Sequence, residues 1–196
     1  MRIFNLLLCA ALFTAACGQK KPLNYKNDGR DIVAFGDSLT YGYGAEQNES
    51  YPAVLAGLTG RDIINLGVSG NTALDGLNRI SELDEYRPYM VLIEFGANDY
   101  MRKRPFEQTK KSLESITDYV QQKGAVAVII DTGGPGMGKY SDYMKELAKQ
   151  KQAVFVPAIL KGIFTKRELK SDMIHPNAQG YKIIAEKVHK HIKDYL

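Results

Sequence analysis

The sequence predicts an α/β protein in which one five-stranded parallel sheet lies between two layers of helices. Short apolar, β-branched runs alternate along the chain with segments of helical periodicity, which is the pattern of strands joined by crossover helices. Four of the five runs are continuously apolar, as expected for strands covered on both faces. Polar motifs follow several runs, at the edge where open parallel sheets place their functional residues. The chain shows no internal repeat and no second domain.

Residues 1–16 stand outside this fold, because they have the organisation of a secretory signal peptide. A short basic start is followed by an apolar run and then by small residues. The apolar run is too short to span the roughly 30 Å hydrocarbon layer of a membrane. Cys17 comes next, as in a bacterial lipobox, although Thr14 stands where such sequences usually carry leucine. We expect cleavage before Cys17 and lipid attachment to its thiol; an ordinary signal peptide with an incidental cysteine is the alternative.

Residues 17–29 are rich in glycine, lysine and asparagine, and we expect them to form a lipidated tether ahead of a folded domain at 30–196. The only other cysteine, Cys9, lies in the segment to be removed, so the domain would have no disulfide. Its stability must then come from an apolar core, which about 180 residues suffice to build. Gly18 after the cysteine favours the outer membrane. The predicted location is the bacterial cell envelope, at the outer membrane or the periplasmic face.

The formal net charge of +4 is mild, and the basic residues are interspersed with acidic ones. Only residues 20–21 and 102–104 form small basic clusters. Nucleic-acid binding requires a basic face with reading elements, so no nucleic acid is expected as a partner. The membrane, reached through the lipid on Cys17, is the expected large partner, and the protein is expected to be a monomer.

The five predicted strands lie at residues 31–35, 62–66, 90–95, 126–131 and 154–156. Two helices between or after them show the 3.6-residue period most clearly. The first has an apolar face formed by Phe106, Thr109, Leu113, Ile116 and Val120. The last begins after the candidate cap Asn177 and has a face formed by Tyr181, Ile184, Val188 and Ile192.

Three residues supply the parts of a nucleophilic triad. Ser38, in Gly36-Asp37-Ser38-Leu39, follows the first strand, and Asp172 and His175 lie three residues apart in a turn after the fifth. Serine attacks only when a base removes its proton, and a carboxylate orients that base. Ser38 could otherwise be a simple helix cap and Asp172 a simple turn residue. Asp37 is the other nearby carboxylate, but its side chain is expected to face away from Ser38, so we interpret it as structural.

His175 is the best candidate for the base because the other two histidines of the chain lie elsewhere. His189 and His191 are two residues apart on the last predicted helix, so their side chains point to different sides and cannot jointly bind a metal. We expect both to be surface residues of a lysine-rich helix end. His175 instead lies beside Pro176 at the predicted functional edge.

Two further motifs follow the second and third strands. They are residues 67–72, Gly-Val-Ser-Gly-Asn-Thr, and residues 96–99, Gly-Ala-Asn-Asp. Together with the motifs at Ser38 and at residues 172–176, they resemble the four motif blocks of the SGNH (GDSL) hydrolases, in the right order. The resemblance covers residues 31–188 and is greatest to the arylesterase, lysophospholipase and acyl-thioesterase branch.

The resemblance implies a flavodoxin-like, three-layer αβα fold (the SGNH hydrolase fold), with no metal and no cofactor. It also implies an acyl-serine intermediate, with an oxyanion hole formed by the N–H groups of Ser38 and Gly70 and the side-chain amide of Asn98. Gly67 is a competing candidate for the glycine, but Gly70 matches the second block and is expected to open a helix. Asp99 is either an anchor behind the site or a helix cap.

The predicted function is therefore a metal-independent serine esterase that hydrolyses carboxylic esters or thioesters. Its substrates are expected to be aryl esters, short- to medium-chain acyl esters or lysophospholipids. An O-deacetylase of envelope polysaccharide is the alternative, and a non-catalytic envelope binding lipoprotein is disfavoured because every residue of the apparatus is present. An α/β-hydrolase is also disfavoured, because no Gly-x-Ser-x-Gly elbow occurs.

A glycine-rich loop after the fourth strand is the candidate substrate loop. Its residues are Gly133, Gly134, Pro135, Gly136, Met137 and Gly138. The glycines are expected to leave its backbone weakly restrained, and Met137 offers an adaptable apolar side chain. We interpret the loop as a mobile flap over the acyl group; a plain connection to the next helix is the alternative.

Overall fold

The computed structural model describes residues 21–196, which form a five-stranded sheet in the order β2-β1-β3-β4-β5 with every neighbouring pair parallel. The strands are β1 (Asp31–Gly36), β2 (Ile63–Gly67), β3 (Pro88–Glu94), β4 (Val126–Ile130) and β5 (Val154–Val156). All five predicted strands are confirmed, with ends that differ by no more than two residues. Central strands β1, β3 and β4 are almost entirely buried, whereas the edge strand β2 is only partly covered.

Within residues 21–196, seven α-helices connect or flank the strands. They are α1 (Ser38–Tyr41), α2 (Tyr51–Thr59), α3 (Ala73–Asn78), α4 (Ala97–Met101), α5 (Phe106–Gln122), α6 (Gly138–Gln150) and α7 (Ala178–Ile192). Short 3₁₀ turns occur at Gln47–Glu49, Ile80–Glu85, Arg167–Leu169 and Lys193–Tyr195. The two predicted helical faces are confirmed, and the Asn177 side chain caps α7 by accepting a hydrogen bond from the N–H of Gly180 at 3.1 Å.

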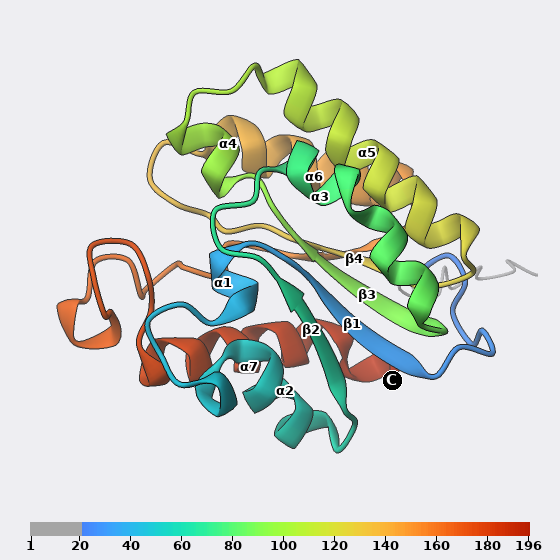
Figure 1. Cartoon of the computed structure of the whole chain (residues 1–196), viewed down its shortest axis with the longest axis horizontal. Coiled ribbons are helices and arrows are strands. Elements are labelled where there is room, and N and C mark those ends of the chain that lie inside the picture. Colours follow the sequence, from blue (N-terminus) through green and yellow to red (C-terminus); the bar gives the residue numbers. More distant parts are fainter. Residues whose placement is uncertain (1–20) are drawn as a thin grey trace, which may run out of the picture.

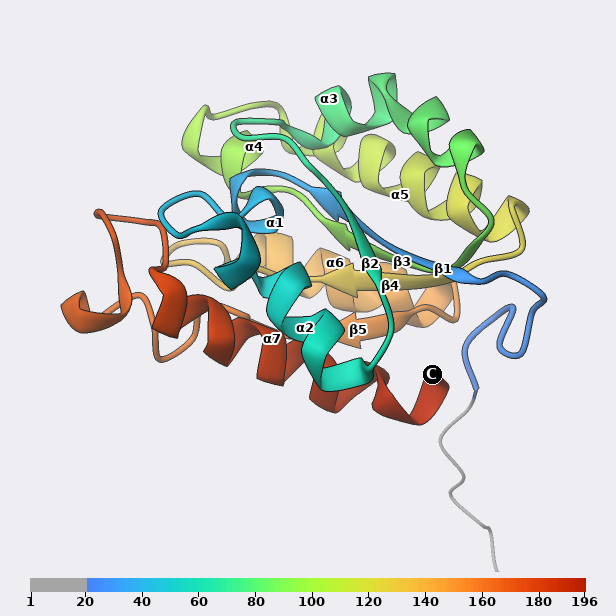
Figure 2. The same cartoon turned by 60° about the horizontal axis from the view of Figure 1, so that its bottom comes forward.

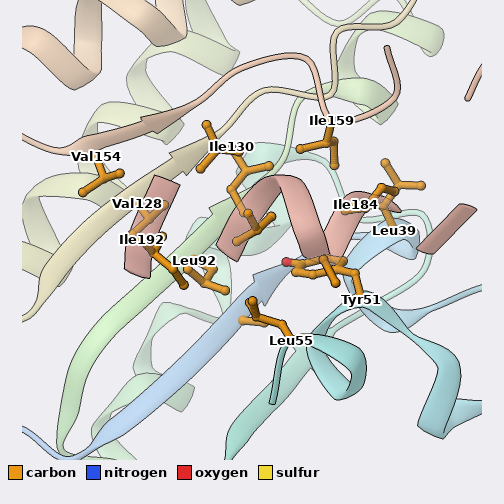
Figure 3. Packing of buried hydrophobic residues seen from close by; sticks show 14 of the residues in the cluster. Leu39, Tyr51, Leu55, Leu92, Val128, Ile130, Val154, Ile159, Ile184 and Ile192 are labelled. Carbon is orange, nitrogen blue, oxygen red and sulfur yellow. The ribbon is translucent and has the colours of Figure 1, made fainter. Parts of the chain in front are cut away.

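The helices form two layers, one on each face of the sheet. Helices α2 and α7 cover one face, and α3, α5 and α6 cover the other (Figures 1 and 2). Figure 3 shows residues of the first of these interfaces, where Leu92 and Val128 of the sheet belong to one buried cluster with Leu55 of α2 and Ile184 of α7. This three-layer αβα arrangement confirms the predicted fold class and leaves the carboxyl ends of the strands open at one edge.

The segment of residues 21–29 is part of the folded domain, which corrects the prediction of a tether over residues 17–29. The N–H of Leu23 donates to the carbonyl oxygen of Gln152 at 2.9 Å, and the amide of Asn24 donates to the carbonyl oxygens of Gln121 at 2.8 Å and Ala125 at 3.1 Å. These acceptors lie around the starts of β4 and β5, so the segment packs at the amino edge of the sheet. Side-chain amides that reach backbone carbonyls far along the chain are invisible in local composition.

The predicted signal peptide and Cys17 lie outside the described residues. Among residues 21–196, no helix combines the length and the apolar character that crossing a membrane requires.

Candidate active site

Ser38, His175 and Asp172 form a continuous hydrogen-bonded chain at the carboxyl edge of the sheet. His175 Nε2 lies 3.0 Å from Ser38 Oγ, and His175 Nδ1 lies 2.7 Å from Asp172 Oδ2. Ser38 is the first residue of α1, directly after β1, and the other two residues lie in the loop that leads to α7. The structure thus brings together three residues that are separated by up to 137 positions. In this arrangement the imidazole can accept the serine proton while the carboxylate orients the ring.

Asp172 organises the loop as well as the imidazole. Its Oδ1 accepts hydrogen bonds from the N–H of Ile174 at 2.8 Å and from that of His175 at 2.7 Å. Burial alone would raise the pKa of Asp172, but hydrogen bonds from the His175 ring and from these two N–H groups outweigh it and lower the pKa to about 2. Asp172 is therefore ionised at neutral pH, as an orienting carboxylate must be.

A tyrosine that the sequence did not single out also holds the imidazole. The ring of Tyr43 packs against the His175 ring, with 4.5 Å between the centroids. The hydroxyl of Tyr181 in α7 donates to the Tyr43 carbonyl oxygen at 2.7 Å, which fixes the loop after α1. The local sequence does not distinguish Tyr43 from the other exposed tyrosines, because His175, against which its ring packs, is 132 positions away in the sequence.

Ser38 is presented by a short helix that Asp37 caps. The carboxylate of Asp37 accepts a hydrogen bond from the N–H of Leu39 at 3.0 Å. Ser38 is thus the first residue of α1 rather than its cap, and α1 spans a single turn. Within the described chain, the N–H of Ser38 has no hydrogen-bond acceptor, so it is available to a ligand.

The two glycines considered for the second donor have different surroundings. A side chain at Gly67 would collide with the backbone of Tyr41, so Gly67 allows β2 and α1 to approach closely. Gly70 lies in the following turn with φ +84°, and its N–H finds no acceptor among residues 21–196. Gly70 does not open a helix: α3 starts at Ala73, after the cap Thr72. A tight turn therefore presents this N–H.

Asn98 is buried at the start of α4, and both of its amide hydrogens have acceptors. Its Nδ2 donates to Asp37 Oδ2 at 3.0 Å and to the carbonyl oxygen of Asn71 at 3.1 Å. The amide is thus held between the β1–α1 turn and the loop that carries Gly70. Asp37 has the structural role expected for it, although the sequence did not indicate its contact with Asn98.

Asp99 is an anchor rather than a cap. Its carboxylate accepts hydrogen bonds from the N–H of Ala73 at 2.9 Å and from the hydroxyl of Thr109 at 2.9 Å. These contacts tie α4 to the starts of α3 and α5. Of the two roles that the sequence left open for Asp99, anchor or helix cap, the structure shows the anchor.

A buried carboxyl pair lies beneath the serine. Glu94, the last residue of β3, is fully buried; its Oε2 accepts from Thr40 Oγ1 at 3.0 Å and from the N–H of Asp37 at 3.4 Å, and its Oε1 has no partner among the described residues. Burial and the nearby Asp37 carboxylate raise the pKa of Glu94 well above its usual value. Burial also raises the pKa of Asp37, to about 6. Glu94 was not identified from the sequence. The feature that could have indicated it is a single charged residue within an otherwise apolar strand.

A cavity of about 240 Å³ opens beside Ser38. Its wall is mainly apolar and includes Leu39, Ala97, Tyr100, Met101, Pro135, Met137, Leu160, Phe164 and Ile174. Asp37, Ser38, Asn98, Thr132 and His175 are polar residues of its lining. Three residues of the candidate substrate loop, Gly134, Pro135 and Met137, line this cavity.

The substrate loop is more restrained than its glycine content indicated. The carboxylate of Asp131 accepts hydrogen bonds from the N–H of Gly133 at 2.9 Å, from Ser141 Oγ at 2.9 Å and from the N–H of Ala158 at 3.1 Å. The Met137 side chain is buried at the cavity wall, 4 % exposed. The expectation of a weakly restrained backbone is therefore wrong at the start of the loop, where one carboxylate joins it to α6 and to the segment after β5.

No group of three or more His, Cys, Asp or Glu side chains in the described part of the chain is arranged to hold a metal ion. His189 and His191 lie on α7, half-buried rather than fully exposed, and His191 Nδ1 is 2.8 Å from the Lys187 carbonyl oxygen.

A parallel αβα sheet with a Ser-His-Asp chain at its carboxyl edge defines a serine hydrolase. The chain belongs to the GDSL-like Lipase/Acylhydrolase family, whose model matches residues 34–183. It is 31 % identical over 209 residues to an arylesterase of Vibrio mimicus, with 100 % of both chains covered. It is 27 % identical over 172 residues to the thioesterase 1/protease 1/lysophospholipase L1 of Escherichia coli, with 83 % of both covered.

A similar solved structure is the psychrotrophic esterase EstA from Pseudoalteromonas, inhibited by monoethylphosphonate. The TM-score is 0.74 at 26 % identity, with 85 % of this chain and 98 % of the other covered. Together with the family match, these relatives support a metal-independent serine ester hydrolase.

Proposed function

We propose that the protein hydrolyses short- to medium-chain carboxylic esters or thioesters, including aryl esters and lysophospholipids, through an acyl-enzyme on Ser38. The observation that carries this proposal is the Ser38–His175–Asp172 chain at 3.0 and 2.7 Å, beside a cavity with a mainly apolar wall. An acyl chain fits such a wall, because each buried methylene contributes about 0.8 kcal/mol. The wall has few polar groups to bind sugar hydroxyls, which disfavours the deacetylase alternative.

The reaction follows from the geometry. His175 Nε2 takes the hydroxyl proton as Ser38 Oγ bonds to the acyl carbon, and the Asp172 carboxylate stabilises the resulting imidazolium. The imidazolium then protonates the leaving oxygen or sulfur, and the acyl group remains on Ser38. Water, deprotonated by the same imidazole, attacks this ester, releases the acid and restores the serine.

The charge on the former carbonyl oxygen needs donors that already point at it. We assign this role to the free N–H groups of Ser38 and Gly70 and to the Asn98 amide. Because both Asn98 hydrogens have acceptors in the resting structure, the oxyanion must share one of them with Asp37 or Asn71. The fixed position of this amide means that little reorganisation accompanies the reaction.

The proposal is tested with a fluorophosphonate probe and a panel of nitrophenyl esters of graded length. We expect one label, on Ser38, and Ser38→Ala should lose the label and on the order of 10⁴-fold or more in kcat. Asn98→Ala should lower kcat by about 10²–10³-fold with little change in KM. Ser69→Ala is the matched control, because Ser69 is an exposed serine at the same edge. A label on Ser69 or Ser171 would contradict the assignment.

We further propose that Cys17 carries a lipid that holds the protein at the cell envelope. The lipobox-like order of residues 14–17 supports this, and a lipidated cysteine with several acyl chains binds membranes firmly. Cys17→Ser should leave the precursor unprocessed or move the protein out of the membrane fraction, with unchanged kcat. Retention of the processed Cys17→Ser protein on membranes would show that another surface binds lipid.

A further inference from the structure

Arg79, at the end of α3, uses all three guanidinium nitrogens within the protein. Its Nε donates to Asn71 Oδ1 at 2.7 Å, and its Nη1 donates to Glu82 Oε2 at 2.9 Å. Its Nη2 donates to two carbonyl oxygens, of Gly36 at 3.0 Å and of Leu66 at 2.9 Å. Only 15 % of the side chain is exposed.

The burial of this cation is costly. Desolvation lowers the pKa of Arg79 despite the ion pair with Glu82. The guanidinium carbon lies 4.3 Å from the centre of the Phe35 ring, a cation–π contact that offsets part of this cost. Glu82 is itself 43 % exposed, so the ion pair is partly screened and contributes little stability. A cation in such a place is better explained by the geometry that it imposes.

The groups that Arg79 binds surround the backbone on both sides of the predicted oxyanion hole. Gly36 is the end of β1, two residues before Ser38, and Leu66 is near the end of β2. Asn71 directly follows Gly70, and its carbonyl oxygen receives the Asn98 amide. One guanidinium therefore links the end of β1, just before Ser38, to the loop of residues 67–72 that contains Gly70, and fixes the distance between them.

The middle of this loop, residues 68–71, has few other ties, whereas Thr72 is fixed as the cap of α3. Besides the contact with Asn98, the backbone bonds of residues 68–71 run from the N–H of Val68 to the Gly36 carbonyl oxygen and from the N–H of Asn71 to the Val68 carbonyl oxygen, each 3.1 Å long. Val68 and Ser69 are exposed. Gly70 has a φ of +84°, which glycine adopts without strain, so its own backbone does little to fix the loop. The side chain of Asn71 is thus held by Arg79, and its carbonyl oxygen is held by the amide of Asn98.

We propose that Arg79 is a positioning residue for ester hydrolysis, which sets the 67–72 loop so that the N–H of Gly70 and the amide of Asn98 point at the same oxyanion. This inference rests on the proposed function, because it needs the donors assigned there. Lysine cannot replace this arginine: it has one nitrogen, whereas the four acceptors lie around a planar fork.

The test compares three variants by kcat per active site, with sites counted from the extent of labelling by the fluorophosphonate probe. Arg79→Lys should lower kcat about 10- to 100-fold with KM changed less than about 2-fold, because misplaced donors act mainly on the transition state. Asn71→Ala removes only the Nε contact and should lower kcat about 5- to 10-fold. Glu82→Gln is the control: it removes the ion pair but no contact to the loop, so its kcat should equal that of the wild type.

Asn71→Ala keeps the inference testable if Arg79→Lys folds poorly, because the arginine still binds both strand ends in that variant. A purely structural role would lower the number of labelled sites and the melting temperature and leave kcat per site unchanged. That outcome, or a loss confined to KM, would overturn the inference. Failure of the proposed function looks different, since the wild type itself would then show no label on Ser38.

Discussion

Glu94 lies in an environment that disfavours an ionised carboxylate. It is fully buried, close to the Asp37 carboxylate, and bonded through only one oxygen within the described chain. Its raised pKa means that the folded protein holds a proton that the unfolded chain has already lost. The folded state therefore binds more protons, and stability falls as pH rises from the ordinary glutamate pKa of 4.5 through the higher folded value.

Glu94→Gln should remove this pH dependence. The amide oxygen still accepts from Thr40 and from the N–H of Asp37, and the amide needs no proton to remain neutral. Between pH 5 and pH 8, the free energy of unfolding measured by urea titration should fall more for the wild type than for Glu94→Gln, by about 1.4 kcal/mol for each unit of pKa shift removed within that range. Glu186→Gln, an exposed change of the same charge, is the control. Equal pH slopes in the wild type and Glu94→Gln would show that Glu94 ionises normally.

Asp172→Asn tests the orientation of the imidazole. The Oδ1 of Asp172 accepts two backbone N–H groups, so the asparagine oxygen should keep that place and its NH₂ should face His175 Nδ1. Nδ1 must then accept, which puts the ring proton on Nε2, where it faces Ser38 and blocks proton transfer. We expect a loss of about 10³–10⁴-fold in kcat with the fold retained, measured together with thermal unfolding. A kcat near that of the wild type would mean that the tautomer does not limit the reaction.

At the scale of elements, the loop between β4 and α6 decides how much of an acyl chain the cavity holds. Gly136 has a φ of +79°, and a side chain there would collide with the Tyr100 hydroxyl, whereas Gly138 has open space. Gly136→Ala should destabilise the protein by about 1–2 kcal/mol through backbone strain and displace Tyr100 from the cavity wall. The substitution should therefore lower kcat/KM for medium-chain esters several-fold more than for acetyl esters, because each methylene of the acyl chain that loses its contacts loses up to about 0.8 kcal/mol of binding free energy.

Gly138→Ala is the control for this loop. The residue opens α6 with no neighbour near the new methyl group, so its activity on both classes of ester should match the wild type. If Gly136→Ala lowered kcat/KM equally for acetyl and medium-chain esters, the loop would not discriminate between chain lengths.

At the scale of the whole molecule, the first described residues and the candidate catalytic residues lie at opposite edges of the sheet. Residues 21–29 pack at the amino edge, and Figure 2 shows the chain entering there, whereas Ser38 follows the carboxyl end of β1. Four residues, 17–20, separate Lys21 from the proposed lipid, and four residues span at most about 14 Å even when fully extended. An anchored protein should therefore turn its active site away from the membrane that holds it.

This orientation predicts where substrate comes from. Lipidated protein in vesicles should hydrolyse a water-soluble ester as fast as the lipid-free domain does. It should cleave lysophospholipid supplied from solution several-fold faster than the same lipid confined to its own vesicle. The lipid-free domain, added to both preparations, is the control and should show no such difference beyond the partitioning of the lipid. Faster cleavage within the anchoring vesicle would contradict the orientation.

The sequence by itself determined the five strands, two of the helices and the candidates for the triad. Strands β1, β3 and β4 are continuous apolar runs, and α5 and α7 have a strict helical period, so local pattern was enough to place them. Asp172 and His175 are three residues apart, so one turn joins them whatever surrounds it, and the motif after β1 singled out Ser38.

The tertiary structure alone decided what holds those residues in place. The contacts of Arg79 with Gly36, Asn98 with Asp37, Tyr43 with His175 and Asn24 with Ala125 join positions 43 to 132 apart in the sequence. A side chain's local neighbours say nothing about such partners, because hydrogen bonds and burial depend on which elements the fold brings together. Periodicity therefore revealed the elements and motifs, whereas only packing could reveal that one arginine and one buried carboxyl pair support the site.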